Sequence, residues 1–241
     1  MIACFSDNPE IIALFLIGSV ATGTERTNSD IDGVAVVSDA YYRQKKNSGL
    51  TCESIWGKCT YEGGYFDVHY KTRREILKIS ETGTEPMRNM FLCARTLFSK
   101  DSELSEIVGR IPVFQTAEAA EKQLRYYCTL KMSYSYFLKV CRPDGFARIH
   151  TINRIIFCTY RLILLENKIL FPSIRKLEET VRNCINKPDG IIEKCLRLIQ
   201  SMSDKDASDL INHYELWTSY NYPDSKDFQF IANNYYDPYE V

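Results

Sequence analysis

The chain has 241 residues, enough for one large domain or two modest domains with a substantial hydrophobic core. Hydrophobic residues make up 45% and charged residues 25% of the chain, the composition of an ordinary soluble globular protein. The formal net charge of −1 argues against a nucleic acid as partner, because nucleic-acid-binding proteins usually carry an excess of basic residues.

The sequence shows neither a recognisable targeting signal nor a cysteine motif that would bind a metal. The first residues lack the basic and long apolar regions of a signal peptide, and the longest apolar runs are far shorter than a bilayer span. We therefore expect a cytoplasmic protein with no membrane association. Nine cysteines occur without a C-x-x-C pair, and none of the three histidines has metal-ligand spacing to a cysteine, so zinc is not expected.

Two apolar runs near the N-terminus predict two strands joined by a loop of small residues. The first run, Ile11–Ile17, is wholly apolar, as expected of a strand covered on both faces. The second, Ile31–Val37, begins with Asp30 and Asp32, which alternation along a strand places on one face. Two neighbouring carboxylates repel each other unless a cation compensates them, and carboxylate oxygens suit Mg²⁺. The pair therefore predicts a magnesium site.

The loop between these strands begins with Gly18 and Ser19. Small residues let backbone N–H groups and a hydroxyl approach phosphate oxygens closely. Together with the carboxylates, the loop predicts a nucleoside triphosphate held by backbone and bridged by metal. The triphosphate carries more negative charge than one Mg²⁺ cancels, and Lys71 and Arg88 are the preferred basic residues to neutralise the remainder.

A third carboxylate, Asp67, lies in the second half of a predicted hairpin. The strand-like runs Leu50–Tyr61 and Tyr65–Lys71 are separated by Glu62-Gly63-Gly64, a hairpin signal. A carboxylate within a strand is costly unless it is hydrated or coordinated, which favours a role for Asp67 in the metal site. The alternatives are an exposed position on an edge hairpin for Asp67 and a metal-free surface pair for the two aspartates before it.

Helical signals dominate the rest of the chain. Thr72-Arg73-Arg74-Glu75 is a capping box, and Glu85-Pro86 begins another short helix. Beyond residue 111 the apolar spacing is helical, and short breaks predict a bundle of about five helices. In the first of them, five residues at spacings of three and four form an apolar stripe: Tyr127, Leu130, Tyr134, Phe137 and Cys141. We predict two domains, residues 1–110 and 111–241.

The N-terminal motif resembles that of the DNA polymerase β-type nucleotidyltransferase superfamily over roughly residues 11–100. Its parts are Gly18-Ser19, nine further residues, Ser-Asp-Ile-Asp from Ser29 to Asp32, and Asp67 in an apolar strand. The resemblance implies an α+β catalytic domain with a mixed sheet and flanking helices. It also implies that Gly18, Ser19 and Ser29 contact the nucleotide, and that Asp30 and Asp32 bind one or two Mg²⁺ ions. Asp67 would complete the metal site or activate the acceptor hydroxyl.

A small catalytic domain followed by an all-α domain is similar to antibiotic nucleotidyltransferases that act on aminoglycosides or lincosamides. The resemblance implies a Mg²⁺-dependent enzyme, monomeric or homodimeric, with the helical domain on the acceptor side. It would transfer a nucleoside monophosphate, AMP from ATP or another NTP, to a hydroxyl of a small molecule and release pyrophosphate. Two alternatives stay open: nucleotidylation of a protein, as by antitoxin-like relatives, and a non-catalytic nucleotide-binding module.

Overall fold

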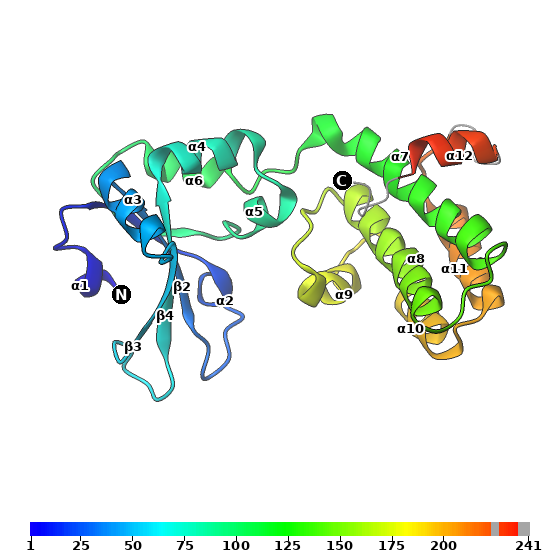
Figure 1. Ribbon diagram of the computed structural model, residues 1–241, viewed down its shortest axis with the longest axis horizontal. Coiled ribbons are helices and arrows are strands. Elements are labelled where there is room, and N and C mark those ends of the chain that lie inside the picture. The colour runs from blue at the N-terminus through cyan, green and yellow to red at the C-terminus, as the bar shows by residue number, and fades with distance from the viewer. Residues whose placement is uncertain (223–226, 236–241) are drawn as a thin grey trace. The chain divides into compact units, whose positions relative to one another are not determined.

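A computed structural model describes residues 1–222 and 227–235 (Figure 1). The chain divides into two compact units, Met1–Val113 and Phe114–Val241. The predicted boundary, between residues 110 and 111, lies close to this division. Residues 223–226 and 236–241, which belong to the predicted helical domain, lie outside the described residues.

The first unit contains a mixed five-stranded sheet in the order β3-β4-β2-β1-β5. The neighbours β2 and β4 run parallel, whereas the other three pairs are antiparallel. The strands are β1 (Ile11–Leu16), β2 (Ile31–Val37), β3 (Cys52–Trp56), β4 (Tyr65–Thr72) and β5 (Arg95–Ser99). The mixed sheet predicted from the sequence is confirmed, and β2 has the predicted bounds.

Short helices flank this sheet. They are α1 (Ile2–Phe5), α2 (Gly18–Thr22), α3 (Asp39–Asn47), α4 (Arg73–Thr82), α5 (Glu85–Asn89) and α6 (Leu104–Arg110). The predicted capping box is present at α4, because the Thr72 hydroxyl accepts from the Glu75 N–H and the Glu75 carboxylate accepts from the Thr72 N–H. Helix α1 was not predicted, since its four residues carry no apolar period.

Both faces of the sheet are buried in its central strands. On one face, Phe15 and Val34 pack with Ile76 of α4 and Leu104 of α6, two helices that lie side by side in Figure 1. On the opposite face, side chains such as Leu14 pack with α1 and with the tyrosines of α3. This two-sided burial explains why β1 is apolar throughout. The same burial fixes the position of β2, at whose N-terminal end Asp30 and Asp32 lie.

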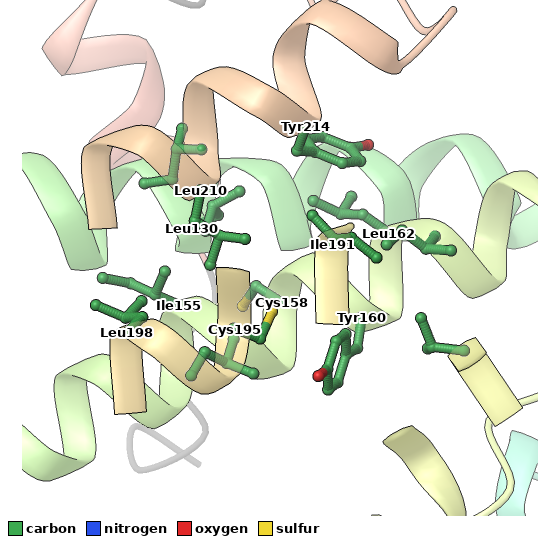
Figure 2. Packing of buried hydrophobic residues seen from close by; sticks show 14 of the residues in the cluster. Leu130, Ile155, Cys158, Tyr160, Leu162, Ile191, Cys195, Leu198, Leu210 and Tyr214 are labelled. Carbon is green, nitrogen blue, oxygen red and sulfur yellow. The ribbon is translucent and has the colours of Figure 1, made fainter. Parts of the chain in front are cut away.

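The second unit is all-α, as predicted. Its described elements are α7 (Thr116–Met132), the π-helix η1 (Ser133–Leu138), α8 (Gly145–Glu166), α9 (Ile174–Arg182), α10 (Ile191–Ser201), α11 (Asp204–Trp217) and α12 (Phe228–Asn234). Figure 2 shows its core, where Leu130 of α7, Ile155 of α8, Leu198 of α10 and Leu210 of α11 converge. Helix α12 is an addition to the predicted bundle. None of the described helices combines the length and apolarity needed to cross a membrane.

The apolar stripe predicted from residue 127 onward is correct except at its last member. Tyr127 and Leu130 are buried, and Tyr134 and Phe137 are partly buried against hydrophobic clusters, but Cys141 is exposed. The fully buried residues of the segment after α7, Ser133 and Leu138, lie outside the stripe. The reason is the π-helix η1, whose hydrogen bonds close over five residues and change the phase of the helix face. A period of 3.6 residues therefore does not place Ser133 and Leu138 on the predicted stripe, although both are buried.

Candidate active site

The site begins where β1 turns into α2. The Ile17 N–H donates to the carbonyl oxygen of Asp32 at 3.1 Å, which joins the end of β1 to the head of β2. The next residue, Gly18, has a φ of +70°, a backbone conformation that favours glycine. A Cβ at this position would lie 2.0 Å from Oδ2 of Asp32. Glycine is therefore required at position 18 for two reasons: the left-handed backbone conformation favours it, and a larger residue would collide with the Asp32 carboxylate.

Three carboxylates converge next to this turn. Asp32 of β2 lies opposite Asp67 of β4 in the parallel register, so both side chains point to the same face of the sheet. Asp30 precedes β2 by one residue and shares that face. Ligand oxygens of the three lie within 4.8 Å of one another, and each side chain is half-buried. The structure thus brings together residues that are 37 positions apart, from 30 to 67.

The donor set of these three residues fits a hard divalent cation. An octahedral Mg²⁺ with bonds of about 2.0–2.1 Å holds neighbouring oxygens about 3 Å apart and opposite oxygens about 4 Å apart. Carboxylate oxygens within 4.8 Å of one another can therefore close on an ion by small side-chain rotations. Without a cation, three carboxylates at this separation repel one another. Half-burial leaves room for water and phosphate oxygens as further ligands.

Two aromatic side chains that the sequence did not single out border the carboxylates. The Tyr65 hydroxyl donates to Oδ2 of Asp30 at 3.1 Å, and this hydrogen bond raises the pKa of Tyr65. The Trp56 indole stacks on the Tyr65 ring with the ring centroids 4.3 Å apart, and 63% of the surface of Trp56 remains exposed. The sequence could have identified Tyr65 as a neighbour of the site, because alternation along the strand places it on the same face as Asp67.

Ser29 directly precedes Asp30, in a loop that folds back on itself. Its Oγ accepts from the Arg26 N–H at 2.8 Å, and its carbonyl oxygen accepts from the Tyr61 hydroxyl. These residues, with Val20 and Ile31 among others, line a cavity of about 370 Å³. The nucleotide contacts predicted for Gly18, Ser19 and Ser29 stay predictions, but all three residues lie at this end of the sheet.

The two predicted basic residues have different positions. Lys71 is half-buried on β4, on the same face as Asp67 and four residues further along the strand, about 13 Å away by strand rise. Its contact with a triphosphate stays a prediction. Arg88 of α5 is buried, with 5% of its surface exposed. Its guanidinium donates to four main-chain carbonyl oxygens, those of Ser80, Glu81, Gly83 and Ile111, at 2.9–3.0 Å.

These contacts contradict a phosphate-binding role for Arg88. A guanidinium that faces the carbonyls at the end of α4 and the segment after α6 stabilises the fold instead. Sequence spacing could not distinguish the two roles, because both require a cation near the sheet and only burial separates them.

Replacing Arg88 with methionine is expected to lower the free energy of unfolding by about 3 kcal/mol or more. The substitution keeps much of the side-chain volume but removes a donor from each of four carbonyls, and two of the lost hydrogen bonds are buried. Urea denaturation followed by circular dichroism measures the change. Arg74→Met, at an exposed position of α4, is the matched control and is expected to shift stability by less than about 0.5 kcal/mol. Equal stability of the two variants would contradict this role for Arg88.

Comparison with known proteins identifies the family that the first unit matches. Residues 1–103 match the family model described as Polymerase beta, Nucleotidyltransferase. The first unit is therefore a nucleotidyltransferase domain of the polymerase β type, as the motif predicted. Among solved structures, the nucleotidyltransferase-like protein from Exiguobacterium sibiricum 255-15 is similar, with 9% identity, a TM-score of 0.49, and coverage of 90% of this chain and 71% of that one. No curated protein matches the sequence.

Proposed function

We propose that this protein is a Mg²⁺-dependent enzyme that transfers AMP from ATP to a hydroxyl group of a small cationic acceptor, with release of pyrophosphate. The observation that carries the proposal is the meeting of Asp30, Asp32 and Asp67 within 4.8 Å, beside Gly18, in a nucleotidyltransferase domain. Three repelling carboxylates are costly to hold together in a protein that binds no cation.

In this transfer, the acceptor oxygen forms a bond to the α-phosphorus as the bond from that phosphorus to the oxygen bridging the α- and β-phosphates breaks. Pyrophosphate leaves with the electron pair of the broken bond, and the hydroxyl proton passes to Asp67 or to water. Asp30 and Asp32 would hold Mg²⁺, which would supply charge neutralisation for the reacting oxygens. The backbone at Gly18 and the Ser19 hydroxyl would orient the triphosphate.

The chemistry around the site supports a small cationic acceptor such as an aminoglycoside. The net charge of −1 gives no overall excess of basic residues to attract a polyanion, whereas three carboxylates attract cations. The exposed Trp56 indole, stacked on Tyr65, offers a ring face of the kind that binds ammonium groups and sugar rings. A lincosamide, which combines an amine with a sugar, has the same features.

The test measures pyrophosphate release from each of the four NTPs with Mg²⁺, alone and with a panel of aminoglycosides and lincosamides. Label from α-³²P-ATP is followed in parallel on the small molecule and on the protein. Turnover that requires a small acceptor, prefers ATP and stops with a chelator is the expected result. Label transferred to protein would favour protein nucleotidylation instead, and nucleotide binding without pyrophosphate release would overturn the enzymatic proposal.

A further inference from the structure

A second group of possible metal ligands lies on the β3-β4 hairpin. Cys52 of β3 is directly opposite His69 of β4 in the antiparallel register, and Asp67 lies two residues before His69 on the same face. The Cys52 Sγ is 3.3 Å from Oδ1 of Asp67 and 3.9 Å from Nε2 of His69. One ligand atom of each residue lies within 4.8 Å of the other two.

The sequence argued against zinc because no histidine has metal-ligand spacing to a cysteine along the chain. That argument does not apply across a hairpin, where residues 52 and 69 become direct neighbours. Register, not sequence spacing, decides which ligands meet. The absence of a motif therefore carries no weight at this position.

The separations within this group match tetrahedral zinc. Bonds of about 2.3 Å to sulfur and about 2.0–2.1 Å to nitrogen or oxygen, at tetrahedral angles, place ligand atoms about 3.5 Å apart. The two sulfur separations, 3.3 Å and 3.9 Å, lie on either side of this value. Cys52 is exposed and His69 half-buried, so an ion can enter from solvent and keep one position for water.

The kinds of donor atom also separate this group from the acidic triad. Mg²⁺ takes oxygen ligands, whereas a set of sulfur, nitrogen and oxygen suits a borderline-soft ion. We propose that Cys52, Asp67 and His69 form a binding site for Zn²⁺. The proposal rests on the hairpin alone and does not depend on the proposed transferase activity. It assigns Asp67 to two adjacent cation sites of different chemistry.

The experiment titrates the full-length, reduced protein with Co²⁺ and then displaces the Co²⁺ with Zn²⁺. Wild type is expected to show a thiolate-to-cobalt charge-transfer band, which Zn²⁺ removes when it displaces the Co²⁺. Cys52→Ser should abolish the band and weaken Zn²⁺ binding at least about tenfold, since even outer-shell changes cost 10–100-fold. His69→Gln should weaken binding comparably and keep the band, because the thiolate remains.

Two control variants make the result specific. Cys4→Ser removes another exposed thiol of the same unit and should leave the affinity and the band unchanged. Asp30→Asn removes a carboxylate from the acidic triad alone and should retain Zn²⁺ binding, so that failure of the Mg²⁺ site is distinguishable from failure of this one. Circular dichroism confirms the fold of each variant. Absence of the band in wild type, or equal Zn²⁺ affinity in wild type, Cys52→Ser and His69→Gln, would overturn the proposal.

Discussion

Asp32→Asn is expected to lower Mg²⁺-dependent nucleotidyl transfer by about 10³-fold or more, the largest effect that we anticipate for any single substitution. The amide has nearly the shape of the carboxylate but lacks its charge, and metal-based stabilisation of the transferring phosphate contributes several kcal/mol. Asp32 is the central member of the triad, because its oxygens lie next to Gly18 and opposite Asp67. Measurement of kcat/KM with the productive acceptor determines the loss.

Asp32→Asn is also expected to change the thermal stability of the protein, which can be measured independently of activity. Neutralising one of three clustered carboxylates relieves repulsion, so the metal-free variant should melt at or above the wild-type Tm. In contrast, the rise in Tm that Mg²⁺ produces in wild type should be lost in Asp32→Asn, because a ligand stabilises a folded protein only if it binds to it. Asp7→Asn, at an exposed position of the same unit, is the control and should behave as wild type. An active Asp32→Asn variant would show that the metal ligands are misassigned.

Gly18→Ala is expected to reduce activity by about 10²-fold or more through displacement of Asp32. The new methyl carbon would lie 2.0 Å from Oδ2, 2.7 Å from Cγ and 2.9 Å from Cβ of Asp32, so the whole side chain must move. A displacement of about 1 Å in a catalytic group is enough to cost this much. The left-handed backbone adds about 1–2 kcal/mol of strain, measurable by denaturation.

Gly23→Ala provides a closely matched control. Gly23 has the same φ of +70°, ends the same helix α2, and has no atom within 4 Å of an added Cβ. It should therefore show a similar loss of stability with activity close to wild type. If both alanine variants lose activity equally, backbone strain alone is responsible and the contact between Gly18 and Asp32 has no special role.

Local features of the first unit were predictable because their causes are local. The bounds of β2, the capping box at Thr72 and the start of α5 at Glu85-Pro86 follow from apolar runs and capping chemistry within a few residues. The aspartates at 30 and 32 share a face because alternation along one strand requires it. The extra helices α1 and α12 were missed, since each is short and without a clear apolar period.

Features that depend on contacts between distant segments were predicted less well. The apolar stripe omitted Ser133 and Leu138, which η1 buries, and included the exposed Cys141. Arg88 was assigned to phosphate although it is buried among carbonyls. Neither a π-helix nor a buried cation has a signature in the spacing of nearby residues. Both are selected by what packs around them, which a linear pattern does not contain.

The sequence by itself determined the class of domain: a glycine-serine turn, a carboxylate pair at the head of an apolar strand, and a third carboxylate in a later strand. Only the tertiary structure decided that these carboxylates meet. The parallel pairing of β2 with β4 aligns Asp32 with Asp67, and the antiparallel pairing of β3 with β4 places Cys52 opposite His69. The register of β4 follows from the burial of one of its faces, because a slip of one residue would turn Asp67 toward the side on which Phe66 and Val68 are buried.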